Sequence, residues 1–428
     1  MTKYIPLPAE FFQKNREKLH CSLAPSSLVI CFSNDVMPVN ADAHYPFVQQ
    51  SDLYYLTGID QEDTVFIMYI DGKGMAHESL FIRETNDWIQ TWEGKKLTIA
   101  EASVLSGIDQ EKIKCTQDWK EIVHIYLPEI QHIYINVKEI PHSIPPKTTA
   151  ELFTKELIVL FGGELIPLTV LTKTLRTCKS ELEISTIRKA LEITHQAFEF
   201  ACKQVKMSVF EYEIEAALTY KMLQLGADGH AFQPIIASGG AANVLHYVTN
   251  HQRITSNSLI LMDFGASYGN YKADITRCVP ANGLFTERQK EVYAAVLSIM
   301  RECIAQMKIG YSIQDWKQFA EEKVAEQLLN LGLLTARELK DEVKKRESVK
   351  KYFPHSIGHH LGLDVHDVCD YSMNMQEGML LTCEPGIYIK EEGIGIRLET
   401  DILITTNGPI DLGSNIPIEI NDIEKLLK

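Results

Sequence analysis

The sequence predicts two domains, an α/β domain followed by an α+β domain. Its 428 residues exceed the length of one ordinary domain of about 150 residues. Hydrophobic residues make up 45% of the chain and charged residues 23%, which is typical of globular proteins. Strand-like and helical segments alternate in the first part of the chain, whereas long amphipathic helices and pairs of strands make up the rest. We therefore predict one domain over residues 1–172 and a second over residues 173–428.

The α/β prediction for the first domain rests on short apolar runs that are separated by helical segments. A polar-rich helix is predicted at 10–20 and an amphipathic helix at 149–161. A turn at 71–74 separates two of the strands. The predicted strands cover residues 27–32, 64–70, 79–83 and 132–137. Residues 165–173 are expected to connect the two domains.

The second domain is predicted to open on long helices that begin with capping boxes. In a capping box, a Ser or Thr and a Glu or Gln three residues later satisfy free amides at the helix start. The boxes are predicted at Ser180–Glu183, Ser208–Glu211 and Thr286–Gln289. Strand pairs are expected near 233–280 and 378–404, which makes this domain α+β. The charged run at 340–351 mixes both signs at helical spacing and is interpreted as a solvated helix face.

The charge balance excludes some classes of partner. The chain has 42 basic and 57 acidic residues and a formal net charge of −15, which argues against nucleic acid or an anionic membrane. No run approaches the roughly 18 apolar residues of a membrane span, and the first residues lack the pattern of a signal peptide. The nine cysteines have neither disulfide-framework nor zinc-site spacing. We therefore expect a cytoplasmic protein.

A predicted hairpin brings two aspartates together. Gly269-Asn270 is a two-residue turn signal, and with these residues at the turn Asp263 faces Thr276 on the opposite strand. Asp263 and Asp274 then lie on one face as diagonal neighbours. Two ionised carboxylates at this distance repel each other unless a cation lies between them. The alternative is that one aspartate caps a turn and the other pairs with Arg277, and the hairpin alone leaves both open.

A cluster of histidines favours a metal site. Four of the 14 histidines fall within twelve residues, with Gly358 and Gly362 between them. Glycines allow a close approach of the backbone, and four histidines together indicate a site where a single one would more often belong to the core. The four are His355, His359, His360 and His366. We expect His359 to be the better metal ligand and His360 to be structural.

Two apolar strands are each predicted to carry one glutamate, Glu384 and Glu399. A glutamate among buried residues is costly unless it is paired or binds an ion. Arg397, two residues before Glu399 on the same predicted strand, could pair with Glu399 or with an aspartate, or support the ligands from outside the metal shell. The acids and one imidazole suit two divalent ions, Mn²⁺, Co²⁺ or Zn²⁺. Two ions about 3.5–4 Å apart would hold a bridging hydroxide and polarise a carbonyl.

In their local context these residues resemble the pita-bread metallopeptidases, which include methionine aminopeptidase, prolidase and aminopeptidase P. The ligands of that family, Asp, Asp, His, Glu and Glu in this order, correspond to Asp263, Asp274, His359, Glu384 and Glu399. The resemblance implies that Asp263 chelates one metal, Asp274 and Glu399 bridge both, and His359 and Glu384 bind the other. It further implies that Glu384 relays the proton of the nucleophilic water and that the metal is most often Mn²⁺.

Three further histidines match the family pattern. His246 and His366 correspond to histidines that contact the scissile peptide and its tetrahedral intermediate, and His355 corresponds to one that lines the proline pocket. Arg397 would support the ligands from outside. The sequence departs from the family pattern at three positions, which affect the expected specificity and not the metal ligands. They are Val48, Phe232 and Ser356.

The first domain extends the resemblance to nearly the whole chain. Residues 40–58 and 91–97 resemble the N-terminal domain of aminopeptidase P, which methionine aminopeptidases lack. This implies metal-dependent hydrolysis of the first peptide bond of peptides with proline in second position. Trp92 is a candidate substrate-binding residue. In relatives its segment approaches the site of a neighbouring subunit, which implies a homodimer or homotetramer, and the alternative is a surface aromatic without a role.

Two other functions remain open from the sequence. Prolidase has the same metal site but cleaves only Xaa-Pro dipeptides. Some pita-bread domains are catalytically inactive peptide-binding modules, and these have lost ligands that this chain retains. Because a fold alone does not fix function, the retained ligand set is the reason to expect an enzyme.

Overall fold

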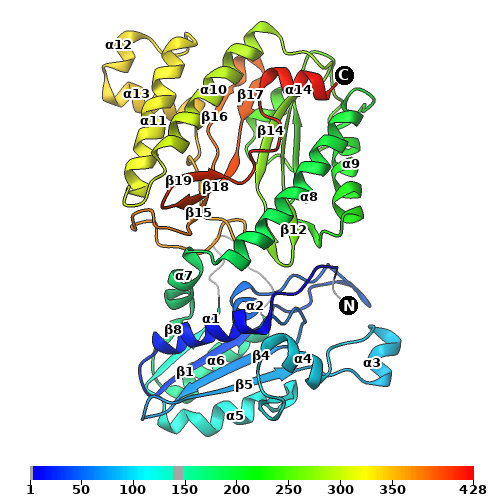
Figure 1. Ribbon diagram of the computed structural model, residues 1–428, viewed down its shortest axis with the longest axis vertical. Coiled ribbons are helices and arrows are strands. Elements are labelled where there is room, and N and C mark those ends of the chain that lie inside the picture. Colours follow the sequence, from blue (N-terminus) through cyan, green and yellow to red (C-terminus); the bar gives the residue numbers. More distant parts are fainter. Residues whose placement is uncertain (1–2, 138–147) are drawn as a thin grey trace. The chain divides into compact units, whose positions relative to one another are not determined.

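The computed structural model describes residues 3–137 and 148–428, which form two compact units (Figure 1). The N-terminal unit comprises Pro6–Leu175. The C-terminal unit comprises Arg176–Lys428 together with residues 3–5. The division at Leu175 lies a few residues beyond the boundary that we predict from the sequence.

The N-terminal unit is built on a mixed six-stranded sheet in the order β6-β5-β4-β1-β7-β8. Its strands are β1 (Ser27–Phe32), β2 (Pro38–Asn40), β3 (Ala43–His44), β4 (Val65–Ile70), β5 (Ala76–Ile82), β6 (Ile113–Cys115), β7 (His132–Ile135) and β8 (Leu165–Pro167). Its helices are α1 (Ala9–Cys21), α2 (Ser51–Thr57), α3 (Asp87–Trp92), α4 (Ile99–Ser106), α5 (Trp119–Tyr126), α6 (Thr149–Phe161) and α7 (Thr169–Thr177), the last of which ends just inside the C-terminal unit. The strands and helices predicted for the first domain are confirmed.

The prediction of a plain connection at 165–173 is wrong. Residues 165–167 form β8, which pairs in parallel with β7 at the edge of the sheet, and α7 begins at Thr169. A strand of three residues has no recognisable period of its own. It exists here because β7 offers a free edge for pairing.

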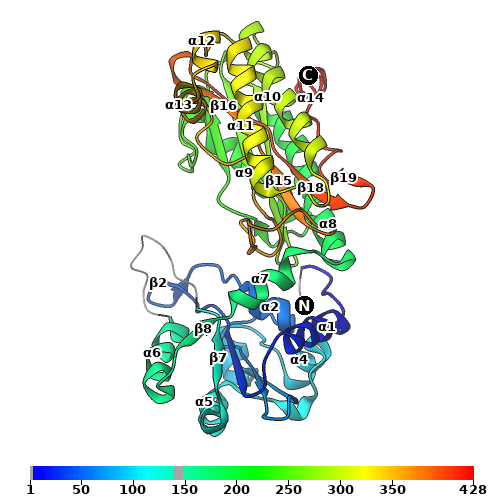
Figure 2. The same cartoon turned by 90° about the vertical axis from the view of Figure 1, so that its left-hand side faces the viewer.

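Helices α5 and α6 cover one face of this sheet (Figure 2). Their residues pack with alternate residues of β1, including Phe32. The rings of Trp119 and Phe153 lie edge to face with centroids 4.5 Å apart, and Phe32 contacts both. The unit therefore has a hydrophobic core of its own.

The C-terminal unit is α+β, as predicted. Its helices are α8 (Glu181–Val205), α9 (Glu211–Gln224), α10 (Glu287–Gln306), α11 (Ile313–Asn330), α12 (Ala336–Leu339), α13 (Glu342–Tyr352) and α14 (Ile420–Leu426). Its strands are β9 (Gly229–His230), β10 (Ile235–Ser238), β11 (Leu259–Phe264), β12 (Ala266–Tyr268), β13 (Tyr271–Lys272), β14 (Ile275–Pro280), β15 (Leu380–Cys383), β16 (Gly386–Ile389), β17 (Ile394–Arg397), β18 (Thr400–Thr405) and β19 (Gly408–Asp411).

Small antiparallel sheets form the centre of this unit. Their orders are β10-β11-β14, β13-β12-β9 and β15-β18-β19, and β16 pairs with β17. Helix α8 packs against β12 and β13, and α10 packs against β15, β16 and β17. Figure 1 shows α8 and α9 on one side of the strands and α10 and α11 on the other.

Two of the three predicted capping boxes are confirmed. The amide of Ser180 donates to Glu183, and the Thr286–Gln289 box starts α10. The box at Ser208–Glu211 is wrong, because the hydroxyl of Ser208 turns back to the end of α8 and donates to the carbonyl of Gln204. Helix α9 begins at Glu211 and is capped by Glu213.

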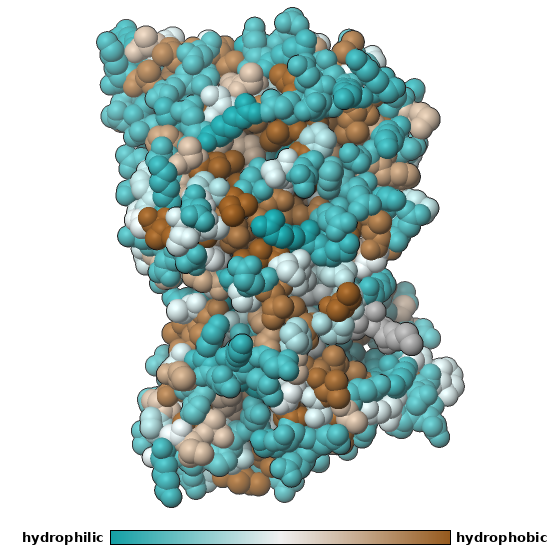
Figure 3. All heavy atoms as spheres, viewed as in Figure 1, coloured by the Kyte–Doolittle hydropathy of each residue, from teal (hydrophilic) through white to brown (hydrophobic). Residues whose placement is uncertain are grey.

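The charged run at 340–351 is a solvated helix, as predicted. It forms most of α13, whose side chains are mainly exposed. Figure 3 shows hydrophilic residues over most of the visible surface at this corner, the upper left of the view. The helix carries charges of both signs, which is typical of a solvated face.

Replacing Phe153 by Ala should destabilise the N-terminal unit because it opens a cavity beside Trp119. We expect a loss of about 3–5 kcal/mol in the free energy of unfolding, measured by urea denaturation with near-ultraviolet circular dichroism. The control is Leu152→Ala on the same helix, where the side chain is 53% exposed; this change should cost about 0.5 kcal/mol or less. Equal losses for both variants would contradict the assigned core.

Candidate metal centre

The predicted hairpin and its register are confirmed. Gly269 and Asn270 adopt left-handed φ angles of 56° and 67°, as a tight hairpin turn requires. Asp263 pairs with Thr276 across β11 and β14. Asp263 and Asp274 therefore lie on the same face, and both are buried.

Three residues that are far apart in the sequence meet at one point. Asp274, His359 and Glu399 each offer a ligand atom within 4.8 Å of the others. The Nε2 atom of His359 lies 3.5 Å from Oδ2 of Asp274 and 3.7 Å from Oε1 of Glu384. The Nδ1 atom of His359 donates to the carbonyl oxygen of His360 at 3.0 Å, so that Nε2 faces the carboxylates with a lone pair.

Asp263 is paired with Arg397 and not with Arg277. The Nη2 atom of Arg397 lies 2.5 Å from Oδ2 of Asp263. Arg277 donates instead to the main-chain carbonyls of four residues, which are Thr276, Glu399, Ile416 and Pro417. The alternative in which Arg277 neutralises an aspartate of the hairpin is therefore wrong.

The two glutamates lie just outside the strands that we predict to carry them. Glu384 lies between β15 and β16, and Glu399 lies between β17 and β18. Arg397 ends β17, so it does not share a strand with Glu399. The Oε2 atom of Glu399 accepts a hydrogen bond from the hydroxyl of Thr276 at 2.7 Å. Each carboxylate thus lies in the short break between two strands.

The loop of His359 is held against β15. A Cβ on Gly358 would lie 2.2 Å from the carbonyl oxygen of Thr382, so only glycine permits this approach. The amide of Thr382 donates to the carbonyl of His359 at 2.9 Å. The hydroxyl of Thr382 accepts from the amide of His359 at 3.1 Å. The close approach that we predict at this glycine is confirmed.

The other predicted histidines differ in burial. Nε2 of His355 lies 2.8 Å from the hydroxyl of Tyr388, and Nδ1 lies 3.6 Å from Oε2 of Glu384. The rings of His366 and His359 have centroids 4.2 Å apart. His246 and His366 are exposed, whereas His360 is fully buried beside Tyr371. The carboxylates thus form the buried side of the cluster, and His246 and His366 lie on its solvent side.

Burial and mutual repulsion hold protons on the carboxylates. Burial raises the pKa of Asp274, and the neighbouring Glu399 and Asp263 raise it further. Burial and then Glu399 raise the pKa of Glu384. Burial raises the pKa of Glu399 to about 7. A cation at this point would remove the repulsion and allow all the acids to ionise.

His355 and His366 are neutral at pH 7. Loss of hydration among the neighbouring side chains lowers the pKa of His355 to about 3, and Arg397 lowers it further. The same loss of hydration lowers the pKa of His366 to about 4, and His359 and then His246 lower it further. A neutral imidazole can accept or donate one hydrogen bond at each nitrogen. These side chains therefore suit contacts with a polar, uncharged group such as a peptide bond.

The residues fit divalent metal ions. Among the described residues, Oδ1 of Asp263 and Oδ1 of Asp274 are buried without a hydrogen-bond partner, which is costly unless an ion contacts them. Carboxylate oxygens with one imidazole are ligands that Mn²⁺, Co²⁺ and Zn²⁺ accept. Asp263, Asp274, His359, Glu384 and Glu399 could hold these ions.

Two supporting residues have no assigned role in the sequence-based site. Thr276 donates to Glu399 and accepts from Nε of Arg397 at 3.2 Å. The hydroxyl of Tyr388 accepts from Nη1 of Arg397 at 2.9 Å. For Thr276, the predicted register, in which it faces Asp263, was a signal in the sequence. For Tyr388, the only signal was its place on the strand after Glu384.

The remaining predicted positions are spread over both units. Trp92 ends α3 in the N-terminal unit and is 73% exposed, and Val48 in the same unit is also exposed. In the C-terminal unit, Phe232 precedes β10 and is half-buried. Ser356 is exposed and donates to the carbonyl of Gly358 at 3.3 Å.

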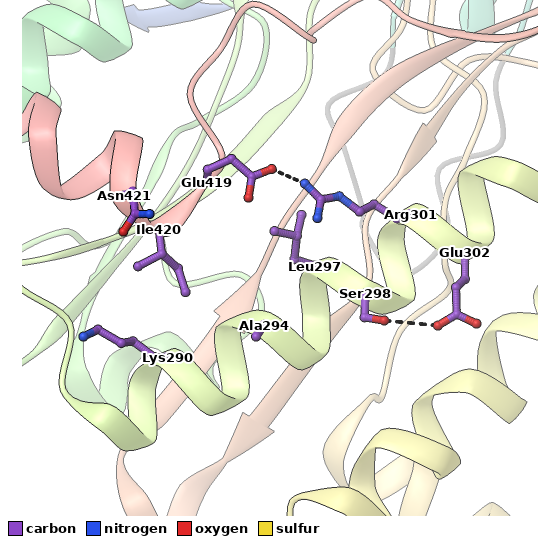
Figure 4. A pocket seen from close by; sticks show the side chains of 9 residues that line it. All are labelled: Lys290, Ala294, Leu297, Ser298, Arg301, Glu302, Glu419, Ile420 and Asn421. Atoms are coloured by element: carbon purple, nitrogen blue, oxygen red, sulfur yellow. Dashed lines mark hydrogen bonds and ion pairs between the residues drawn. The ribbon is translucent and has the colours of Figure 1, made fainter.

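A surface hollow of about 560 Å³ lies elsewhere in the C-terminal unit, between α10 and the start of α14 (Figure 4). Arg301 bonds Glu419 and Ser298 donates to Glu302 within its lining. It contains none of the predicted site residues. The hollow is thus separate from the metal centre.

Comparisons with known proteins agree with the fold class that we predict. The model of metallopeptidase family M24 matches residues 185–406, and that of the aminopeptidase P N-terminal domain matches residues 12–134. A Xaa-Pro aminopeptidase from Haemophilus influenzae is 29% identical over 433 residues, 98% of either chain. A solved candidate aminopeptidase P from Bacillus anthracis has a TM-score of 0.90 and 34% identity, with 98% of both chains covered. Aminopeptidase P from Escherichia coli, solved with the inhibitor Pro-Leu, has a TM-score of 0.89 and 28% identity, with 99% of both covered.

No helix in the described part of the chain is long and apolar enough to cross a membrane.

Binding of Mn²⁺ should release protons, because the acids of the site must ionise to bind it. Glu399, with a pKa of about 7, is mostly protonated at about pH 6.5 in the metal-free protein. The affinity for Mn²⁺ should therefore rise as the pH rises towards 7. Titration calorimetry at about pH 6.5 in two buffers of different ionisation enthalpy counts the protons. Equal binding heats in both buffers would contradict the raised pKa.

Proposed function

The chain belongs to metallopeptidase family M24, and from this we propose that it is a Xaa-Pro aminopeptidase. It would release the first residue of peptides that have proline in second position. The observation that carries the proposal is the convergence of Asp274, His359 and Glu399 within 4.8 Å. The match of residues 12–134 to the N-terminal domain of aminopeptidase P favours this activity over that of methionine aminopeptidase.

We propose that the centre holds two divalent ions, most often Mn²⁺, with Co²⁺ or Zn²⁺ as alternatives. Asp263 would chelate one ion, Asp274 and Glu399 would bridge both, and His359 and Glu384 would bind the other. Two such ions supply an activated water and polarise the scissile carbonyl. The unpartnered oxygens of Asp263 and Asp274 support this assignment.

Glu384 is proposed to take the proton from the attacking water. A carboxylate beside the attacking water can accept its proton and later give it to the leaving amine. The Oε2 atom of Glu384 lies 3.6 Å from Nδ1 of His355. The acid is therefore next to the histidine that would line the proline pocket.

His246 and His366 are proposed to contact the scissile peptide and its tetrahedral intermediate. Both are exposed on the solvent side of the carboxylates, where a peptide can reach them. A donor that meets the developing negative charge can supply a factor of about 10²–10³ in kcat. Arg397 would orient the metal ligands without binding a metal itself, since its Nη2 atom lies 2.5 Å from Oδ2 of Asp263.

Trp92 is proposed to help bind the peptide across a subunit boundary in a homodimer or homotetramer. Its ring is 73% exposed, and Trp88, one turn earlier on α3, is 62% exposed. Two exposed tryptophans on one short helix are unusual for a surface without a partner.

The acidic net charge of −15 disfavours binding to nucleic acid or to anionic membranes. We therefore propose a cytoplasmic enzyme that binds neither.

The function can be tested with two substrates. The protein, loaded with Mn²⁺, is incubated with Gly-Pro and with Arg-Pro-Pro, and the release of the first residue is followed by chromatography. We expect cleavage of the tripeptide. Cleavage of the dipeptide alone would make the protein a prolidase. If neither peptide is cleaved with Mn²⁺, Co²⁺ or Zn²⁺, the protein is a catalytically inactive peptide-binding module instead.

Asp274→Asn should abolish turnover and lower the metal content, because the amide cannot bridge two cations as a carboxylate does. Metal content is measured by mass spectrometry of the purified protein, and turnover with the tripeptide. Asp315→Asn, at an exposed position in the first turn of α11, is the control and should change neither. Full activity of Asp274→Asn would disprove the bridging role.

A further inference from the structure

We propose that Glu211, a glutamate outside the metal centre, is a positioning residue for His246 and acts through Tyr247. The proposal rests on the proposed function in one respect, that His246 contacts the substrate. Glu211 is the first residue of α9, and it is fully buried. It is not needed to cap this helix, since Glu213 does so.

The carboxylate of Glu211 is the meeting point of four hydrogen bonds from one loop. Its Oε1 atom accepts from the amide and from the hydroxyl of Ser238, both at 2.7 Å. Its Oε2 atom accepts from the hydroxyl of Tyr247 at 2.8 Å and from the amide of Gln252 at 2.9 Å. A buried carboxylate is tolerated only when its lone pairs are satisfied in this way. One side chain thus ties the beginning, the middle and the end of segment 238–252.

A second acid of α9 strengthens the same anchor. Glu215 lies one helical turn after Glu211, on the same face. Its Oε2 atom accepts from Nδ2 of Asn250 at 2.9 Å. The side chain of Asn250 also accepts from the amide of Ile236 and donates to the carbonyl of Pro234, both at 2.9 Å. Helix α9 therefore fixes both arms of the loop that joins β10 to β11.

The loop is supported from the other side by β17. Its 3₁₀ turn at Gly239–Asn243 packs on this strand. A Cβ on Gly395 of β17 would lie 2.5 Å from the carbonyl oxygen of Ala242, so the strand approaches the loop as closely as glycine allows. Two residues later, β17 ends in Arg397, which bonds Asp263. The loop is thus held between α9 and a strand that belongs to the metal centre.

The histidine is at the exposed part of this anchored loop. Tyr247 is buried with its hydroxyl on Glu211, whereas its neighbour His246 is exposed. His246 is a neighbour of His355 and His366. Because Tyr247 points inwards to Glu211, the preceding His246 lies on the outer side of the loop. Without the bond, His246 would be free to occupy several positions.

The test is Tyr247→Phe, which removes the hydroxyl and keeps the ring. With the tripeptide substrate and saturating Mn²⁺, we expect kcat to fall about tenfold while KM changes less than twofold. In a His246→Ala background the same substitution should have no further effect on kcat. Tyr212→Phe, at an exposed tyrosine of α9, is the matched control and should change neither constant. Equal effects of Tyr247→Phe in both backgrounds would reduce Glu211 to a stabilising residue and overturn the proposal.

Hydrogen exchange followed by mass spectrometry tests the anchor without any activity. Tyr247→Phe and Glu211→Gln should increase exchange in residues 239–252 and leave β15 unchanged. Unchanged exchange in this loop would overturn the proposal even where the enzyme is active. If the wild-type protein cleaves no peptide, the proposed function fails, and the exchange result still decides whether Glu211 holds the loop. Should Glu211→Gln not fold, Tyr247→Phe alone decides.

Discussion

The repulsion between buried carboxylates is the constraint on which the C-terminal unit depends. Asp263, Asp274, Glu384 and Glu399 come from four chain segments and meet in a region from which water is largely excluded. Burial alone raises the pKa of Asp274 and Glu384, and their neighbours raise it further. Such a cluster is unfavourable unless protons or cations neutralise it. Divalent metal ions held between these acids would neutralise it.

The rest of the unit keeps the acids in place despite this repulsion. Arg397 joins Asp263 to the hydroxyl of Tyr388, and Thr276 joins Arg397 to Glu399. These bonds link β11, β14, β16 and β17, so that no strand can shift alone. The lack of a side chain at Gly358 allows the loop of His359 to reach β15. Orientation of the ligands by such a surrounding network is common in metal sites.

Function is divided between rigid and loop-borne residues. The acids lie in strands or in the short breaks between them, whereas His246 and His366, which we propose to contact the substrate, lie on loops. A loop can place a side chain accurately only when its backbone is tied at several points. The ion pairs of Asp367 with Arg176 and Lys179 do this beside His366, and Glu211 does it around His246. Acids away from the metals thus also shape the site.

The sequence alone determined the domain order, the α+β class of the second domain, the hairpin register and the candidate ligands. These depend on local signals, such as the turn at Gly269-Asn270 and the period of two along a strand. It could not determine that Arg397 pairs with Asp263. Nor could it determine that Glu211, which we predict in a capping box, instead accepts hydrogen bonds from residues 238–252. It also missed β8, which exists only through its neighbour β7. Only the tertiary structure decided these features, because a buried charge takes whichever partner the packing brings to it.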